Sequence, residues 1–250
     1  MPRVRDSSDG GDTRDPDKAL YARMRWNMPL SPEHAELLLD RLDLRDGQRI
    51  ADLGCGWGEL LLTAAGRAGA GTAGLGIDTD ESLLERGRRE AAARGLPVEF
   101  LNADVASWRG TADRVLCTGA SHAFGGTADA LRSLAGVVPA GGRLLYGDAI
   151  WSRPPSPEAV GLLGDGIGSL TELLDAVRAS GWRAIHVSEA DQREWDDFES
   201  TFRAGRQEWL LANPGHSRAA DIREWLDDRE RGYVTVYRGV LGFAHVILAH

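Results

Sequence analysis

The sequence is short of several features that mark large classes of proteins. Only two of its 250 residues are cysteines, and neither Cys55 nor Cys117 belongs to a metal-ligand or disulfide framework. We therefore predict no metal and a reduced, cytoplasmic setting. No apolar run approaches the roughly 18 residues of a membrane span, and the N-terminus lacks the apolar core of a signal peptide. We expect a soluble, unexported protein with no membrane partner.

Runs of basic residues are also missing. The formal net charge is -9, so the chain lacks the electrostatic footprint of a protein that binds nucleic acid or anionic lipid. A small molecule, or a protein contacted over a small area, is the partner that this charge favours. The hydrophobic content of 42% is enough for one large domain or two small ones, and we favour one.

The first part of the chain divides into a leader and a helical segment. Residues 1–17 are polar and mixed in charge, which predicts a disordered leader ahead of a single domain over 18–250. Two helical patterns lie between Ala19 and Leu44, in a region (18–45) that we interpret as a lid. Ser31 and the following proline predict the start of a helix that runs through Leu42.

The middle of the chain alternates between strand and helix patterns, which is typical of a parallel sheet with helices on both faces. This alternation covers the predicted core, 46–150, and the remaining residues, 151–250, are predicted to hold substrate-side helices and the last two strands. The predicted strands are 49–53, 73–78, 97–101, 112–118, 142–148, 182–188 and 234–248, and the predicted helices are 58–68, 80–94, 126–137, 168–179, 191–212 and 217–230.

A glycine turn between the first strand and its helix is the strongest functional signal. The run Asp52-Leu-Gly-Cys-Gly-Trp-Gly58 leads a buried strand into a helix, and its glycines let the backbone come close to a ligand. The second strand ends at Asp78, 20 residues after Gly58, where an acid that holds ribose hydroxyls is expected in a βαβ unit. Together they predict a nucleotide-binding crevice.

Two further segments follow in the expected order. Asn102-Ala-Asp104-Val105 comes just past the third strand, and the run from Val115 to Phe124 follows the fourth. With these four motifs, residues 26–150 resemble the class I S-adenosylmethionine-dependent methyltransferases. The resemblance implies a cofactor site, with S-adenosylmethionine as cofactor and S-adenosylhomocysteine as product, made of Trp26, Asp52, Gly54, Cys55, Gly56, Asp78, Thr79, Asn102, Asp104, Val105, Thr118 and Gly119.

The resemblance also implies a seven-stranded, mainly parallel Rossmann-like sheet with an antiparallel last strand and a helical cap. The activity it implies is in-line transfer of a methyl group to a small-molecule acceptor through an oxygen, nitrogen, sulfur or carbon atom. His122 follows the fourth strand, where it is a candidate general base and substrate contact. Trp151, Arg203 and Arg206 are further candidate substrate contacts, and we expect a monomer or a homodimer.

Alternatives to these interpretations stay open from the sequence. A nicotinamide-dependent oxidoreductase would also use Asp78, although Glu59 places a carboxylate where its pyrophosphate would lie. A non-catalytic S-adenosylmethionine-binding protein is the other alternative. Asp78 and Asp104 could also act as helix caps, and the aromatic stripe in 191–212 is usually core.

Overall fold

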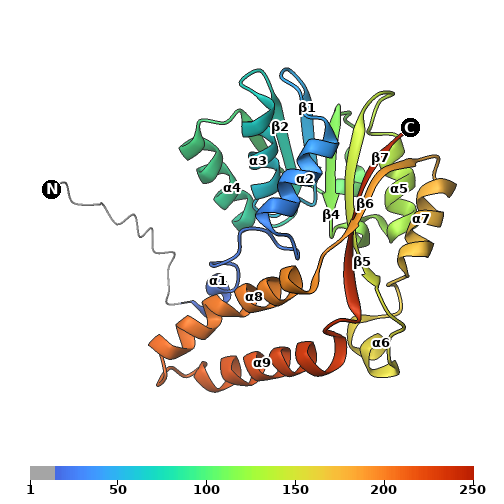
Figure 1. The fold of residues 1–250 in the computed structure, drawn as a ribbon. Helices are drawn as coiled ribbons and strands as arrows, with labels where there is room; N and C mark the ends of the chain where they lie inside the picture. Colours follow the sequence, from blue (N-terminus) through green and yellow to red (C-terminus); the bar gives the residue numbers. More distant parts are fainter. Residues whose placement is uncertain (1–14) are drawn as a thin grey trace.

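One sheet organises the molecule. The computed structural model describes residues 15–250, whose strands form a seven-stranded sheet in the order β3-β2-β1-β4-β5-β7-β6 (Figure 1). The strands are β1 (Arg49–Leu53), β2 (Ala73–Asp78), β3 (Val98–Asn102), β4 (Arg114–Thr118), β5 (Arg143–Trp151), β6 (Arg183–Glu189) and β7 (Leu241–Ala249). Neighbouring strands from β3 to β5 pair in parallel, whereas β7 is antiparallel to β5 and β6. The expected sheet is confirmed.

Helices cover both faces of this sheet. One face carries α2 (Pro32–Leu42), α3 (Glu59–Ala68) and α4 (Glu81–Arg94), and the other carries α5 (Thr127–Ala135) and α7 (Leu170–Ala179). Two apolar clusters, one on each face, bury the alternating side chains of the strands. The order of the strands reverses between β1 and β4, which is where open α/β sheets form a ligand crevice.

The helical cap lies below the carboxyl end of the sheet in Figure 1. It consists of α8 (Gln192–Ala212) and α9 (Ala219–Gly232), with the short helix α1 (Pro16–Ala19) against α8. Inside the cap, the fully buried Glu199 carboxylate accepts two hydrogen bonds from Arg229, at 2.7 and 3.0 Å, and a third from the Tyr237 hydroxyl at 2.9 Å. This buried charge is therefore paired, as its burial requires.

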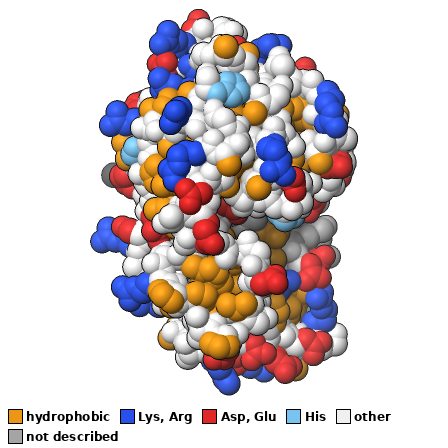
Figure 2. Space-filling view, turned by 90° about the vertical axis from the view of Figure 1, so that its right-hand side faces the viewer, with side chains coloured by type: hydrophobic (Ala, Val, Ile, Leu, Met, Phe, Trp, Pro, Cys, Tyr) orange, Lys and Arg blue, Asp and Glu red, His pale blue; other side chains and the backbone are white. Residues whose placement is uncertain are grey.

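The outer surface also divides into two parts, the sheet with its helices and the helical cap (Figure 2). Figure 2 shows a hollow between the upper body of the molecule and the lower helical part, and hydrophobic side chains gather on the lower part. The lower part includes α6 (Pro157–Leu163) and α9 (Figure 1).

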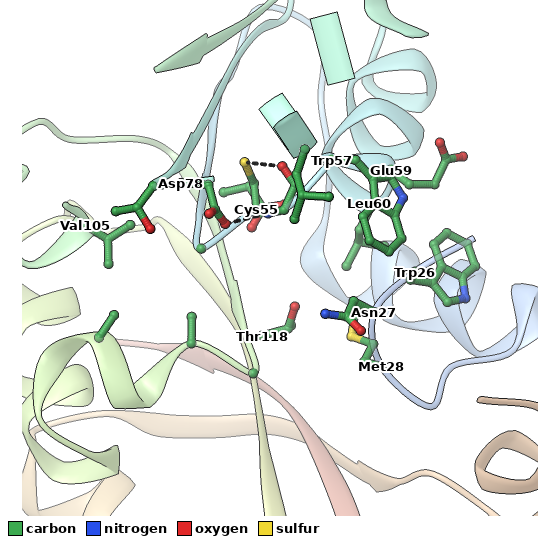
Figure 3. Close-up of a pocket in the computed structure, with 18 of the residues that line it drawn as sticks. Trp26, Asn27, Met28, Cys55, Trp57, Glu59, Leu60, Asp78, Val105 and Thr118 are labelled. Atoms are coloured by element: carbon green, nitrogen blue, oxygen red, sulfur yellow. Dashed lines mark hydrogen bonds between the residues drawn. The ribbon is translucent and has the colours of Figure 1, made fainter. Parts of the chain in front are cut away.

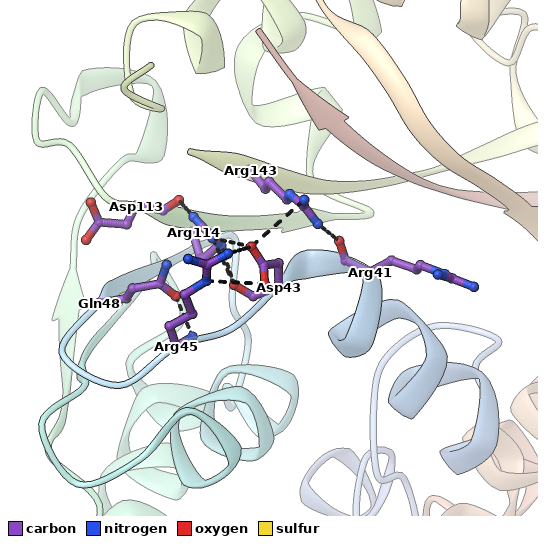
Figure 4. Close-up of polar contacts among 7 residues, drawn as sticks. All are labelled: Arg41, Asp43, Arg45, Gln48, Asp113, Arg114 and Arg143. Atoms are coloured by element: carbon purple, nitrogen blue, oxygen red, sulfur yellow. Dashed lines mark hydrogen bonds and ion pairs between the residues drawn. The ribbon is translucent and has the colours of Figure 1, made fainter. Parts of the chain in front are cut away.

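A cluster of charged residues surrounds the C-terminus of α2, at the opposite end of the sheet (Figure 4). Asp43 follows the helix in the left-handed conformation, with φ of 58°. Its carbonyl oxygen accepts hydrogen bonds from Nε and Nη2 of Arg114, at 3.1 and 2.8 Å. Arg143 donates to the Arg41 carbonyl beside it. These arginines satisfy carbonyl groups that the end of a helix leaves without partners.

Three segments differ from the sequence predictions. The segment 20–30, where a helical pattern was predicted, contains turns and bends. The Arg86 guanidinium donates hydrogen bonds to the Tyr21 and Met24 carbonyls, and the Trp57 indole donates one to the Arg25 carbonyl, so these carbonyls are not available to a helix. The predicted strand 234–248 begins only at β7, since 233–237 continues α9 as a π-helical turn, η3 (Tyr233–Tyr237). Helix α6, capped by Ser156, was not predicted.

The predicted leader lies mostly outside the described residues, but its last residues are structured. Asp15 caps α1 with its side chain, and Pro16 takes the first helical position. Asp17 is bound by Arg206 of α8 and by Arg218, both at 3.0 Å. Residues 15–17 of the predicted leader therefore lie at the surface of the cap in a defined structure.

Candidate active site

The glycine turn after β1 adopts a conformation that requires glycine. The backbone N–H groups of Gly54 and Cys55 both donate to the Ile77 carbonyl of β2, at 2.9 and 3.1 Å. Gly54 has φ of +80°, and a Cβ atom there would lie 2.4 Å from Cβ of Ala120. The turn therefore lies close against the loop that follows β4.

A cavity of about 230 Å³ opens at the carboxyl ends of β1, β2 and β4 (Figure 3). Asp78 and Val105 lie on one side of it and Trp26, Asn27 and Met28 on the other (Figure 3). Its lining residues are Trp26, Asn27, Met28, Asp52, Gly54, Cys55, Gly56, Trp57, Glu59, Leu60, Asp78, Thr79, Leu83, Asp104, Val105, Thr118, Gly119, Ala120, His122 and Ala123. We call this cavity the first pocket.

Asp52 is the most perturbed acid of the first pocket. It is 4% exposed, and burial together with the nearby charge of Asp78 raises the pKa of its carboxyl group to about 8. Within residues 15–250, burial and the Asp78 charge act on this carboxyl group without a hydrogen-bond donor to offset them. A buried acid without a partner calls for a cationic ligand group.

Asp78 and Asp104 are held by the backbone around them. Asp78 accepts hydrogen bonds from the N–H groups of Gly56, at 2.8 Å, and Asp80, at 3.0 Å. Asp104 accepts one from the N–H group of Ala106 at 2.9 Å, at the start of the short helix η1 (Val105–Ser107). Asp104 is the N-cap of η1, whereas the N-cap of α4 is Asp80 and not Asp78. Both Asp78 and Asp104 line the first pocket. A role in the local backbone structure is therefore compatible with a role in the cofactor site for both residues.

The segment 21–30 covers the first pocket and is fixed by two distant groups, Trp57 and Glu194, and by one hydrogen bond of its own. The Trp57 indole donates to the Arg25 carbonyl at 2.8 Å, and the Trp26 indole donates to the Leu30 carbonyl at 2.5 Å. At the far end of the segment, the Ser31 N–H donates to the Glu194 carboxylate at the start of α8, at 2.7 Å. We call this segment the lid, because it joins the cofactor half of the fold to the cap.

A second pocket of about 380 Å³ adjoins the first. The two share Asn27, Met28 and Gly119. Aromatic side chains dominate the lining of the second pocket, which consists of Tyr21, Asn27, Met28, Pro29, Gly119, Asp148, Ala149, Trp195, Phe198, Phe202 and Phe243. The lid, the end of β5, the cap helix α8 and β7 therefore meet around one space.

Comparison with known proteins identifies the family. Residues 50–142 match a family described as "Methyltransferase domain". The structure of a SAM-dependent methyltransferase from Thiobacillus denitrificans, in complex with S-adenosyl-L-homocysteine, is 32% identical, with a TM-score of 0.83, and the match covers 93% of this chain and 96% of that one. The chain belongs to the class I S-adenosylmethionine-dependent methyltransferases. A SAM-dependent methyltransferase from Geobacter sulfurreducens, also with S-adenosyl-L-homocysteine, is 29% identical over 93% of this chain and 96% of that one, with a TM-score of 0.84.

A curated relative shares nearly the whole length of the methyltransferase. The uncharacterized protein YjhP of Escherichia coli is 31% identical over 229 residues, which cover 88% of this chain and 91% of that one. The cofactor is S-adenosylmethionine, because the two bacterial methyltransferases carry its product S-adenosylhomocysteine. This family membership decides against the nicotinamide-dependent oxidoreductase and the non-catalytic binding protein.

The first pocket fits this cofactor in its charge. S-Adenosylmethionine carries a sulfonium and an ammonium cation, and the unpaired, buried Asp52 offers a carboxyl group to a cation. Glu59 also lines the pocket, although its carboxylate is bound by Arg94 at 2.7 and 3.0 Å. No Lys or Arg is among the lining residues of the first pocket, which suits a cofactor without phosphate.

The structure brings most of the predicted site residues of the methyltransferase together. Every predicted cofactor residue except Asn102 lines the first pocket, as does His122. Asn102 instead donates to the Glu81 carboxylate at 2.9 Å, outside the pocket. His122 lies on the short helix η2 (Ser121–Phe124), which directly follows β4.

The three other predicted substrate contacts line neither pocket. Trp151 packs in the apolar cluster on the α2 side of the sheet. Arg203 donates to the Glu199 carbonyl at 3.1 Å and pairs with Glu230. Arg206 pairs with Asp17 and stacks over the Trp225 ring at 4.2 Å. These contacts favour structural roles in the cap for both arginines.

Sequence reasoning missed the residues that make the second pocket. Trp195, Phe198 and Phe202 follow a helical period, which we interpreted as core, and Asp148 was passed over in favour of Trp151. The signal that could have identified Asp148 is its position near the carboxyl end of β5, at the edge of the sheet where ligands bind.

Among residues 15–250, no group of three or more His, Cys, Asp or Glu side chains is arranged to hold a metal ion. In the same part of the chain, no helix is both long enough and apolar enough to span a bilayer.

Proposed function

We propose that the methyltransferase transfers its methyl group to a small molecule bound in the second pocket. The observation that carries this proposal is the pocket itself, about 380 Å³ in volume, which adjoins the first pocket through Asn27, Met28 and Gly119. That volume lies within the range of small-molecule sites. The net charge of -9 disfavours nucleic acid as the acceptor.

When bound, S-adenosylmethionine supplies an electrophilic methyl group for in-line displacement by an acceptor nucleophile. In our proposal, Asp52 pairs with the cationic methionine end, and Asp78 accepts hydrogen bonds from the ribose hydroxyls. Asp104 and Val105 hold the adenine on the other side of the pocket, and Thr118 forms part of the wall beside Gly119. These residues position the cofactor, which is the main form of catalysis such a reaction needs.

The lid and the cap exclude water in this proposal. Met28 lines both pockets, and Phe198 and Phe202 of α8 close the acceptor side with apolar surface. A nucleophile held in a dry, oriented position reacts faster than one in water, by an amount worth about 7–11 kcal/mol in well-oriented systems. The proposed roles of the domain parts follow: 18–45, which contains the lid, covers the site, 46–150 is the cofactor core and 151–250 is the acceptor side.

His122 is the proposed general base where the acceptor carries a proton that must leave. It lines the first pocket beside Gly119 and Ala120, on the helix that follows β4. We expect His122→Gln to lower kcat by about 100-fold or more at neutral pH and to leave cofactor affinity unchanged. A variant that keeps the wild-type kcat and pH profile would contradict the base role.

The acceptor class is tested with the enzyme and methyl-labelled S-adenosylmethionine in a cell extract. After the reaction, ultrafiltration separates label in small molecules from label in macromolecules. Label in the filtrate supports the proposal, whereas label only in the retained protein or nucleic acid overturns it. Asp52→Asn, which removes the cation-binding carboxylate, serves as the control for enzyme-dependent transfer. The cytoplasmic location and the monomeric or homodimeric state stay predictions from the sequence.

A further inference from the structure

Asp148 is the one charged residue in the lining of the second pocket. The other lining residues with polar side-chain groups are Asn27, Tyr21 and Trp195, which carry an amide, a hydroxyl and an indole N–H. No Lys, Arg or His is among the lining residues. An anionic molecule would therefore face a carboxylate and find no cation on the pocket wall.

Asp148 is held in place as a hydrogen-bond acceptor. Its Oδ2 atom accepts from the Tyr146 hydroxyl at 2.8 Å and from the Thr127 hydroxyl at 2.9 Å, while Oδ1 accepts from the N–H of Ala149 at 2.9 Å. Burial and the Asp148 charge raise the pKa of Tyr146, so the phenol keeps its proton and donates it to this bond. Three donors fix the orientation of this carboxyl group.

The aromatic rings of the wall form a connected series. Trp195 and Phe198 meet edge to face with their centroids 5.8 Å apart, and Phe198 stacks on Phe202 at 6.1 Å. Tyr21 of the lid reaches Phe202 at 6.0 Å. Aromatic faces attract cations, and this attraction strengthens where water is excluded.

The arginine that lies over a ring of this wall is already paired with a carboxylate. Arg229 lies over the Phe202 ring at 5.0 Å, outside the lining of the second pocket. Its guanidinium is bound at two points by the fully buried Glu199 carboxylate, at 2.7 and 3.0 Å. The pair is neutral in sum, so Asp148 still sets the charge of the pocket.

We infer that the acceptor is an organic amine, with a basic nitrogen bound by Asp148 and an apolar or aromatic body packed against the rings of the second pocket. This inference rests on the proposed function and names its substrate class. Asp148 is a binding residue in it, whichever atom of the acceptor receives the methyl group. A carboxylate and several aromatic rings together recognise ammonium groups through charge and cation–π attraction.

The test measures binding to the enzyme saturated with S-adenosylhomocysteine, by isothermal titration. The probes are matched sets with the same body: phenethylamine, 2-phenylethanol and 3-phenylpropanoate, and tryptamine with tryptophol and indole-3-propanoate. We expect each amine to bind at least tenfold more tightly than its alcohol, and each carboxylate to bind more weakly than the alcohol. Alcohols or carboxylates that bind as tightly as the amines would overturn the inference.

Two variants test whether the preference for amines over alcohols depends on Asp148. Asp148→Asn keeps the side-chain volume and should reduce the amine-to-alcohol ratio at least fivefold, while its affinity for S-adenosylhomocysteine stays at the wild-type value. Asp175→Asn, on the exposed surface of α7, is the matched control and should keep the wild-type ratio. An Asp148→Asn variant that folds and keeps the full preference would overturn the assignment.

The inference and the proposed function fail in different ways. If the extract experiment labels small molecules but the labelled products are neutral or anionic, the substrate class is wrong and the proposed function stands. If the label enters only macromolecules, both are wrong. The amine-to-alcohol ratio of the wild-type enzyme is informative by itself, so the test does not depend on the stability of any variant.

Discussion

We predict that the ionisation of Asp52 governs how cofactor binding depends on pH. Burial and Asp78 raise its pKa to about 8, so the carboxyl group of the ligand-free enzyme holds a proton at neutral pH. A cationic ligand group favours the ionised form, so binding releases that proton. We expect affinity for S-adenosylmethionine to rise by about tenfold or more between about pH 6 and 8. Titration calorimetry in two buffers measures both the affinity and the proton.

Asp52→Asn is the control for this prediction. The variant should bind more weakly and show no rise over the same pH range. The stability of the ligand-free wild type has the opposite slope. Because the folded pKa is above the unfolded value of about 3.9, the stabilising contribution is fully present below about pH 4 and is lost as pH rises through about 8. Urea unfolding at several pH values measures it, and a flat profile would contradict the buried, protonated carboxyl group.

Asp78 carries the second prediction for a single residue. Asp78→Ala should weaken S-adenosylmethionine binding at least tenfold, because it removes the proposed ribose acceptor and the acceptor for the Gly56 N–H at once. Asp78→Asn keeps an oxygen for the Gly56 N–H, so it should restore the turn but only part of the affinity. Near wild-type affinity in the alanine variant would mean that the ribose is held elsewhere.

At the scale of elements, the end of α2 depends on a buried arginine. The Arg114 side chain is 5% exposed and donates two hydrogen bonds to the Asp43 carbonyl. Arg114→Met should lower the free energy of unfolding by about 2–3 kcal/mol, because it leaves that carbonyl buried without its partner. Arg45→Met is the control, since Arg45 pairs with the same Asp43 but is 71% exposed, and its effect should be much smaller. Equal losses in urea unfolding would contradict this role.

Local sequence patterns predicted most strands and α-helices of the cofactor half within about two residues, although β5 ends three residues beyond its predicted end. β1 and β2 begin and end where their buried apolar runs do, and Ser31 and Pro32 start α2 as expected. The helical pattern predicted across the lid was wrong, because backbone carbonyls of the lid accept hydrogen bonds from Arg86 and Trp57, which lie at least 32 residues away along the chain. No local pattern records such a contact.

The acceptor side could not be predicted for a similar reason. Asp148 and Phe198 come together only when α8 packs across the carboxyl end of β5. A helix with aromatic residues on one stripe has the same sequence pattern whether that stripe meets a core or lines a cavity. The start of β7 was also misjudged, because Tyr233 and Tyr237 have strand-like propensity but are held by Asp196 and Glu199 of α8 in a π-helical turn.

For the whole molecule, cofactor binding should raise the melting temperature. A ligand at 100 times its Kd stabilises the folded state by about 2.7 kcal/mol, which corresponds to about 5–10 °C in a protein of this size. We expect this shift with S-adenosylmethionine or S-adenosylhomocysteine and none with NADH. Gly54→Ala, whose Cβ atom would lie 2.4 Å from Ala120, should abolish the shift. A full shift in that variant would contradict the first pocket as the cofactor site.

The lid has a consequence for the order of events during turnover. Asn27 and Met28 line both pockets, and Ser31 ties the end of the lid to Glu194 of α8. A molecule in the second pocket therefore lies against the same segment that must open before the first pocket can empty. The kinetic mechanism that follows is a compulsory sequence, with the methyl donor first on and the demethylated donor last off. Product-inhibition patterns should then show S-adenosylhomocysteine as competitive with S-adenosylmethionine and not with the acceptor.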